Sequence, residues 1–361
     1  MNERIDRQES YEGTKPVVQA HRIDETRLAQ FMTNHIEGFK GPIEVEQFKG
    51  GQSNPTYCIT ATSGKYVLRR KPPGKLLKSA HAVDREYRVI SALKAQDFPV
   101  PKPHVLCTDD SVLGTMFYIM DFADGRVVWN PHVPDVSREH RAAIFDSLNA
   151  TIAQLHAIDP DYAGLSDFGK PGGYVARQID RWSKQYKASE TQKVVEMDKL
   201  MAWLPDACPE DSDVAVVHGD FRLDNAVLHK TEPDIIAVLD WELSTLGDPI
   251  ADFTYHMMQW HMPPSNSGAG VGSLIGHDLD ELGIPSMEDY IERYCERTGR
   301  SEIGNFDFYF AYNFFRMGAI FQGIVGRVRD GTAANPNAAA MESQVAPMAE
   351  VAWRYAKRAG A

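Results

Sequence analysis

The chain has 361 residues, 43% of them hydrophobic and 24% charged, which corresponds to an ordinary folded protein of about two domains. Lys and Arg number 38 against 50 Asp and Glu, and this net charge of -12 argues against a nucleic-acid-binding surface spread over the whole molecule. No stretch approaches the ~20 apolar residues of a membrane span, and the start lacks the apolar run of a signal peptide, so we expect a cytoplasmic protein.

The first part of the chain has the pattern of a small antiparallel sheet. Residues 1–23 are polar and aperiodic and form an expected N-terminal arm. Alternating β-rich segments joined by turns predict a three-stranded meander at 43–48, 56–62 and 65–70. A helical pattern follows at 79–94 and a short apolar strand at 116–122. We therefore predict a sheet with one helix over residues 24–121.

The second part, residues 122–361, is predicted to be mostly helical. An amphipathic pattern starts at Ser137, and a compact β-type region interrupts the helices at 214–241. Residues 306–328 have the composition of a buried helix with close neighbours, and 341–358 of a last amphipathic helix. The fold class that follows is α+β, with a small sheet lobe and a larger helical lobe.

The β-type region contains the residues with the clearest chemistry. A polar loop between two apolar strands holds Asp220 and Asn225, which are five residues apart. This is the spacing at which a kinase catalytic loop places the acid that accepts the acceptor's proton and the amide that binds Mg²⁺. A third apolar strand ends at Asp240. Two oxygen donors, with ATP phosphates, would suffice to hold one hard cation.

Two other interpretations of this loop remain open. Asp220, Asp224 and Asn225 would satisfy backbone donors if the loop were only a turn. A metal-dependent hydrolase using His218, Asp220 and Asp240 is the sharper competitor. It leaves the upstream features unexplained.

Those upstream features suit the phosphates and base of a nucleotide. The glycine-containing segment 49–55 joins two strands and permits close approach of backbone amides to phosphate. Arg69 lies on a strand face opposite Tyr66 and Leu68, and Glu86 falls on the inward stripe of the following helix, so we expect these two residues to pair. The backbone from Asp121 to Ala123 would face adenine.

The motifs H-G-D-F-R-L-D-N, L-D-W-E and G-D-P-I-A-D resemble those of the aminoglycoside phosphotransferase family, over roughly residues 25–330. That family has a bilobal protein-kinase-like fold, which also serves choline and fructosamine kinases. The segments G-G-Q-S-N-P-T-Y and Y-V-L-R-R-K-P-P-G look closest to the kinase domain fused to acyl-CoA dehydrogenases in animals and to its bacterial stand-alone relatives. That branch is associated with phosphorylating hydroxy acids or their CoA esters.

The resemblance implies ATP and Mg²⁺ as cofactors and assigns roles by position. Asp220 would be the catalytic base, with His218 bracing its loop. The implied metal ligands are Asn225 and Asp240, the phosphate-positioning pair is Arg69 with Glu86, and the phosphate loop contains Gly51, Ser53 and Asn54. The sequence departs from protein kinases in having arginine for the strand lysine, no G-x-G-x-x-G loop, and Trp-Glu after Asp240.

The phosphate acceptor remains open between anionic and cationic molecules. One face of the helix at 172–186 carries Arg177, Arg181 and Lys184, which is either an ordinary solvated surface or a cleft lining that favours an anionic acceptor. The net charge favours an aminoglycoside or amino alcohol weakly. A catalytically silent ATP-binding regulator is the alternative from another class of function.

The segment Gly247–Asp248–Pro249 predicts the start of a helix, with Asp248 as its cap. We expect Asp248, and Asp252 one turn later, to have structural roles.

Overall fold

A computed structural model describes residues 8, 12–49, 54–72, 81–210, 213–264, 272–331 and 338–361. The chain divides into two compact units. The sheet unit lies within Arg7–Val128 and Asn225–Ser244, and the helical unit within Trp129–Asp224 and Thr245–Ala361. The lobe boundaries predicted at residues 23 and 121 stay predictions.

The sheet unit is built on a six-stranded antiparallel sheet in the order β1-β2-β3-β4-β6-β5. The predicted meander is present as its β2, β3 and β4. The sheet is wider than predicted because two short strands, β1 and β5, extend its edges. The strands are β1 (Thr14–Lys15), β2 (Ile43–Phe48), β3 (Thr56–Ala61), β4 (Gly64–Arg70), β5 (Pro103–Cys107) and β6 (Phe117–Asp121).

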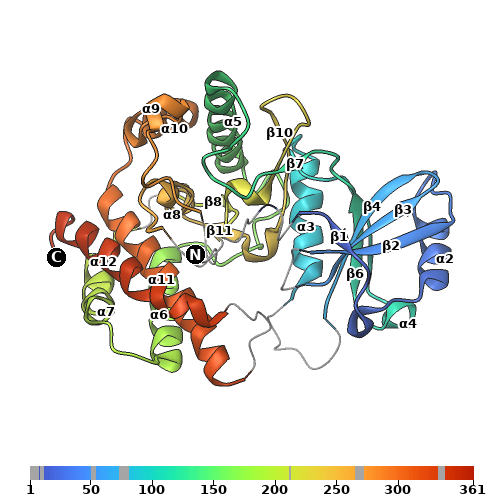
Figure 1. The fold of residues 1–361 in the computed structure, drawn as a ribbon, viewed down its shortest axis with the longest axis horizontal. Helices are drawn as coiled ribbons and strands as arrows, with labels where there is room; N and C mark the ends of the chain where they lie inside the picture. Colours follow the sequence, from blue (N-terminus) through green and yellow to red (C-terminus); the bar gives the residue numbers. More distant parts are fainter. Residues whose placement is uncertain are drawn as a thin grey trace, which may run out of the picture. The chain divides into compact units, whose positions relative to one another are not determined.

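A helix packs on each face of this sheet (Figure 1). On one face, α2 (Glu25–His35) buries Leu28 and Met32 against a core that includes Tyr66 and Leu68 of β4. On the other face lies α3 (Val83–Lys94). The prediction of a single helix was wrong, because α2 and the short α4 (Asp110–Leu113) are also present.

The signal for α2 was available in the sequence. Asp24 accepts a hydrogen bond from the Arg27 N–H as the helix N-cap, and Leu28 and Met32 follow at helical spacing.

Residues 225–244 belong to the sheet unit through a second, three-stranded sheet. Its order is β10-β9-β7, from β7 (Arg126–Val127), β9 (Ala226–Leu228) and β10 (Ile235–Val238). The short helix η3 (Trp241–Leu243) follows β10, and the Trp241 ring packs edge-on against Phe98. The end of the β-type region thus lies against α3 and the loop that follows it.

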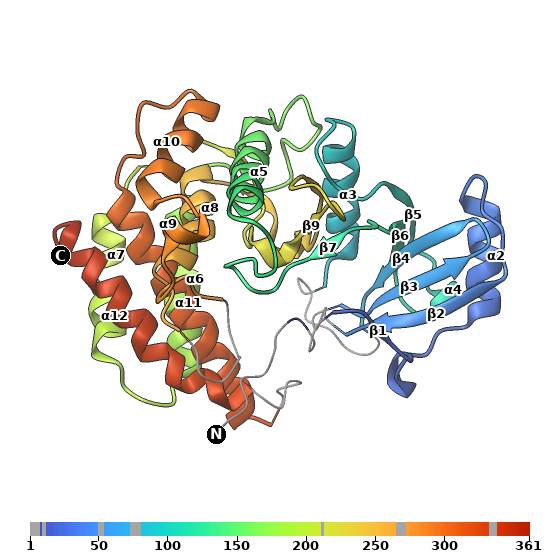
Figure 2. The same cartoon turned by 45° about the horizontal axis from the view of Figure 1, so that its top comes forward.

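The helical unit packs its helices around α11 (Phe306–Arg329), which runs beside α12 (Glu342–Arg358) and α6 (Tyr174–Ser189) (Figure 2). Both predicted C-terminal helices are therefore confirmed. A Cβ at Gly326 of α11 would lie 2.6 Å from the Ser189 Cβ, so glycine permits the close approach to α6.

The other elements of the helical unit pack against this group or against one another. They are α5 (Arg138–Ala157), α7 (Val195–Ala207), β8 (Ala215–Val217), β11 (Thr245–Gly247), α8 (Pro249–His256), η4 (Met257–Trp260), α9 (Leu279–Leu282), α10 (Met287–Thr298) and η5 (Ala338–Met341). In this unit β8 pairs with β11. The α+β prediction is confirmed. Among the described residues, the helices are too short or too polar to cross a bilayer.

Candidate active site

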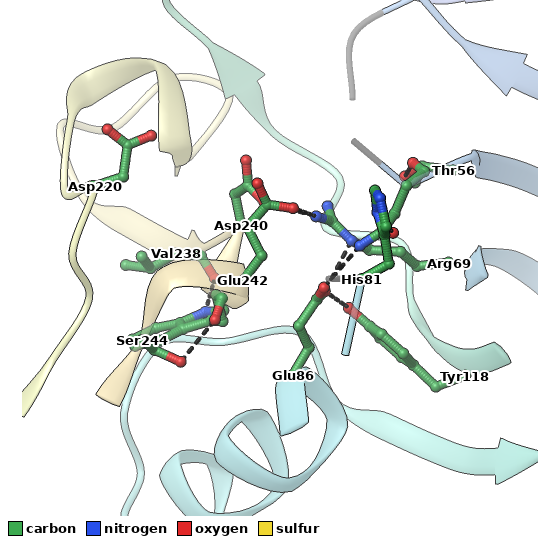
Figure 3. Close-up of polar contacts among 12 residues, drawn as sticks. Thr56, Arg69, His81, Glu86, Tyr118, Asp220, Val238, Asp240, Glu242 and Ser244 are labelled. Atoms are coloured by element: carbon green, nitrogen blue, oxygen red, sulfur yellow. Dashed lines mark hydrogen bonds and ion pairs between the residues drawn. The ribbon is translucent and has the colours of Figure 1, made fainter. Parts of the chain in front are cut away.

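Arg69 and Glu86 form the buried ion pair that the sequence predicts (Figure 3). The Arg69 Nε lies 2.8 Å from the Glu86 Oε2, and Glu86 is 1% exposed. The alternation of β4 directs Arg69 away from the core under α2 and towards α3. Burial raises the pKa of the Glu86 carboxyl, and the Arg69 cation opposes that rise. Each partner therefore compensates the burial of the other.

The same guanidinium holds two more carboxylates. The Arg69 Nη2 lies 2.7 Å from the Asp240 Oδ1 and 3.2 Å from the Glu242 Oε2 (Figure 3). With all groups ionised, one cation meets three anions, which leaves a surplus of two negative charges. The Asp240 and Glu242 side chains keep 34% and 28% exposure, so a cation can approach them. A divalent ion would balance this surplus.

Glu242 is a site residue that the sequence pattern did not single out. Its signal was its place two residues after Asp240, at the end of an apolar strand. A short turn after such a strand keeps both acids near the same strand end.

Asn225 and Asp240 come from adjacent strand ends. Ala226 of β9 is opposite Val238 of β10, and the Leu239 N–H donates to the Asn225 carbonyl at 2.8 Å. Asp240 itself has a φ of 64°, a left-handed conformation that turns the chain from β10 into η3. The two predicted metal ligands thus lie at the same end of the β9–β10 pair, Asn225 just before β9 and Asp240 just after β10.

The donor set at this end fits magnesium. Carboxylate and amide oxygens are hard ligands, and Mg²⁺ is usually held by one or two protein ligands together with substrate phosphates and water. Within the described parts of the chain, no cluster of three His, Cys, Asp or Glu side chains would hold a metal. A cation at Asn225 and Asp240 would therefore need oxygens of the nucleotide or of water as further ligands.

The predicted phosphate loop is described only at its end. Gly51 and Ser53 lie outside the described residues. Asn54 is fully buried, its Nδ2 donates to the Glu86 Oε1 at 3.0 Å, and its Oδ1 lies 2.8 Å from the His81 Nδ1. The Asn54 side chain therefore supports Glu86, and its phosphate role stays a prediction.

The predicted adenine-facing backbone follows β6. The Asp121 N–H donates to the Lys102 carbonyl at 2.9 Å and the Phe122 N–H to the Lys65 carbonyl at 3.3 Å. Both of these amide hydrogens serve the sheet, and adenine recognition by the backbone from Asp121 to Ala123 stays a prediction. The Asp121 carboxylate lies 2.6 Å from the His104 Nε2.

In the helical unit, two side chains among the described contacts hold Asp220. The Tyr255 hydroxyl donates to the Asp220 Oδ1 at 2.6 Å, and the Arg222 Nε lies 3.1 Å from the same oxygen. Arg222 also pairs with Asp224, at 3.4 Å. Tyr255 is a further partner that the sequence did not predict.

The backbone around Asp220 is anchored by Asp252 of α8. Its two carboxylate oxygens accept the N–H groups of His218 and Gly219, each at 2.8 Å, and its Oδ2 lies 3.3 Å from the His156 Nε2. Burial alone would raise the pKa of Asp252, but the hydrogen bond and charge of His156 and the loop amide bonds lower it overall.

His218 is fully buried, and its Nδ1 accepts the Asp220 N–H at 3.2 Å, which fits the predicted bracing role.

Asp248 caps α8, as predicted. Its Oδ1 accepts the Ile250 and Ala251 N–H groups, at 2.8 and 3.2 Å, and its Oδ2 accepts the Tyr309 hydroxyl at 2.7 Å. This cap fixes the helix that carries both Asp252 and Tyr255.

The basic face of α6 is largely engaged with its own neighbourhood. Arg177 donates to the carbonyls of Lys170 and Gly172, and Lys184 pairs with Asp180 one turn away. Arg181 lies over the Trp182 ring at 5.1 Å. A role of this face in acceptor binding stays a prediction.

Within the sheet unit, Arg69 thus contacts both Glu86 and Asp240. The backbone of Asn225 lies next to that of Leu239, the residue before Asp240. Asp220 belongs to the helical unit, and its alignment with a nucleotide stays a prediction.

Comparison with known proteins identifies the family and the fold. The model of the phosphotransferase enzyme family matches residues 44–287. A Ralstonia eutropha protein whose crystal structure carries the name aminoglycoside phosphotransferase is 48% identical in sequence to this chain. The two structures match with a TM-score of 0.85 over 93% of this chain and 99% of that one. A Cryptosporidium parvum choline kinase shares the fold at 12% identity, with a TM-score of 0.62 over 93% of this chain and 97% of that chain. The expected kinase-like fold is confirmed.

Curated relatives are longer than this chain. Acyl-CoA dehydrogenase family member 10 of Mus musculus is 40% identical over 96% of this chain and 32% of its own length. Family member 11 of Rattus norvegicus is 39% identical over 96% of this chain and 45% of its own length. The chain therefore spans less than half the length of these relatives.

Proposed function

Because this chain belongs to the phosphotransferase enzyme family, we propose that it transfers the γ-phosphate of ATP to a hydroxyl group of a small-molecule acceptor. The family establishes the class of enzyme, a small-molecule kinase. The acceptor and the roles of individual residues are the proposal.

In the proposed step, Asp220 receives the proton of the acceptor hydroxyl. The acceptor oxygen forms a bond to the γ-phosphorus while the bond from that phosphorus to the β–γ bridging oxygen breaks, and ADP leaves with the electron pair. Catalysis of this reaction depends mainly on alignment and on stabilising charge.

The observation that carries the proposal is the cluster of Arg69 with three carboxylates. Arg69 would contact the α- and β-phosphates while Glu86, 2.8 Å away, keeps it in place. Asp240 and Asn225 would hold Mg²⁺, which supplies positive charge to the phosphate oxygens when bound. On binding of the metal, we expect Asp240 to exchange its contact with Arg69 for one with the cation.

For the acceptor, we propose a hydroxy acid or its CoA ester. The support is the similarity along almost the whole chain to proteins named acyl-CoA dehydrogenase family members. The name of the 48% identical Ralstonia protein favours a second candidate, an aminoglycoside or amino alcohol.

An ADP-release screen with Mg²⁺ and ATP tests both candidates. Hydroxy acids, their CoA esters, aminoglycosides and amino alcohols would be compared with a no-acceptor blank. We expect turnover with the first two groups. Preference for the cationic compounds would reject the acceptor proposal, and ATP binding without turnover on a broad panel would instead favour a silent regulator.

The same assay tests Asp220. Asp220→Asn should lower kcat by about 10²- to 10⁴-fold, the usual contribution of a positioned base. Asp124→Asn is the matched control, because it makes the same charge change at an exposed site paired only with the surface Lys230 in the contacts described. Equal activity of the two variants would contradict the assignment of the base.

A further inference from the structure

Tyr255 makes the shortest described contact with the proposed base. It lies on α8, is 5% exposed, and its hydroxyl donates to the Asp220 Oδ1 at 2.6 Å. Burial and the neighbouring Asp220 charge raise the pKa of the phenol well above its usual range. The hydroxyl therefore keeps its proton and acts as a donor at neutral pH.

A carboxylate needs such a partner to hold one orientation. The terminal torsion of aspartate is broad and roughly two-fold, so its own bonds do not fix the plane of the carboxylate. A hydrogen bond of 2.6 Å from a buried ring fixes one oxygen. Loss of that bond would leave the carboxylate with the longer Arg222 contacts, at 3.1 and 3.4 Å, which hold its orientation relative to the reacting hydroxyl less tightly.

Tyr255 is itself held by Arg316 of α11. The Arg316 guanidinium lies 4.7 Å from the centre of the Tyr255 ring, and its Nη2 donates to the Gly219 carbonyl at 2.6 Å. Trp182 of α6 lies 5.8 Å from the same cation. One buried arginine thus fixes both the tyrosine and the residue directly before Asp220.

We propose that Tyr255 is a positioning residue for phosphoryl transfer, whose hydroxyl fixes the Asp220 carboxylate in the orientation that receives the acceptor's proton. The inference rests on the proposed function of Asp220. The Tyr255 hydroxyl acts through Asp220 and makes no contribution to nucleotide binding.

The test compares Tyr255→Phe with Tyr312→Phe in the full chain. Both changes delete a buried phenolic hydroxyl, but within the described residues the Tyr312 hydroxyl has no hydrogen-bond partner. With the best acceptor from the screen, Tyr255→Phe should lower kcat by about 10- to 100-fold and change the KM for ATP by less than about twofold. Tyr312→Phe should retain wild-type values.

A double-mutant cycle separates positioning from a general structural effect. In an Asp220→Asn background, Tyr255→Phe should lower the residual kcat by less than about twofold, because its partner in catalysis is already gone. A wild-type kcat for Tyr255→Phe, an equal fall for Tyr312→Phe, or an undiminished fall in the Asp220→Asn background would overturn the inference. If Asp220→Asn alone keeps full turnover, the proposed function of Asp220 fails instead.

Discussion

The candidate residues of the sheet unit and those of the helical unit are stabilised by different interactions. In the sheet unit, side-chain charges meet around Arg69, and the Asp240 and Glu242 side chains remain 34% and 28% exposed. In the helical unit, Asp252 and Arg316 bind the backbone of the loop before Asp220, and these two residues are only 3% and 5% exposed. We therefore expect the first region to rearrange when a cation or phosphate binds, and the second to keep the geometry that folding gives it.

This difference corresponds to the tasks proposed for the two regions. A nucleotide and its metal bring several charges, so the groups that receive them must be able to exchange partners. A base must be in position before the acceptor arrives, because misplacement of reacting groups lowers the rate steeply. Changes to the two regions should therefore have different consequences.

The largest effect on stability is expected for Arg69→Met. The change leaves Glu86 buried beside further acids without its cation, and breaking such a pair typically costs about 3–5 kcal/mol. Urea unfolding would measure the loss. Arg27→Met is the control in the same unit, because the Arg27 side chain is 65% exposed and its described contacts, with Asp24 and with the Ser111 carbonyl, lie at the surface, so a change of less than about 1 kcal/mol is expected. Equal losses would show that the Arg69 cluster behaves as a surface ion pair.

The helical unit should respond to acid through His256. Burial lowers the pKa of this imidazole to about 4, from the 6.5 of a free side chain, and its Nε2 lies 2.7 Å from the Tyr290 hydroxyl. The unfolded chain takes up this proton at higher pH than the folded one. The contribution of His256 is therefore fully present above the unfolded pKa and is lost as pH falls through the folded pKa, by about 3 kcal/mol in all.

Unfolding of the wild type and His256→Phe would be compared at about pH 7 and about pH 4. The variant lacks the titrating group, so its stability should fall less on acidification, even if loss of the contact with Tyr290 weakens it at both pH values. An identical pH dependence would show that His256 titrates normally in the fold.

The smallest effect is expected for Tyr309→Phe. The hydroxyl donates to the Asp248 cap at 2.7 Å, while two backbone N–H groups still bind the other oxygen of that carboxylate. Loss of one such bond should cost about 1–2 kcal/mol of unfolding free energy and leave the KM for ATP unchanged. A loss as large as that of Arg69→Met would mean that the cap of α8 is as critical as the charged cluster.

The regions also differ in how far the sequence predicted them. The Arg69–Glu86 pair followed from strand alternation and from the inward stripe of one helix, which are local patterns. The Asp248 cap followed from the proline after it. The contacts of Asp252, Tyr255 and Arg316 with the loop at Asp220 could not be predicted in the same way, because they depend on how α8 and α11 pack against residues more than thirty positions away.

The central claim is that Asn225 and Asp240 bind the metal that accompanies ATP. A crystal grown with Mn²⁺ and a non-hydrolysable ATP analogue tests it directly, since Mn²⁺ prefers the same oxygen ligands and has a usable anomalous signal. The account predicts a peak at coordination distance, about 2.1–2.3 Å, from the Asn225 side-chain oxygen and an Asp240 oxygen, with analogue phosphates completing the shell. A peak elsewhere, or phosphates bound without these two residues, would contradict it.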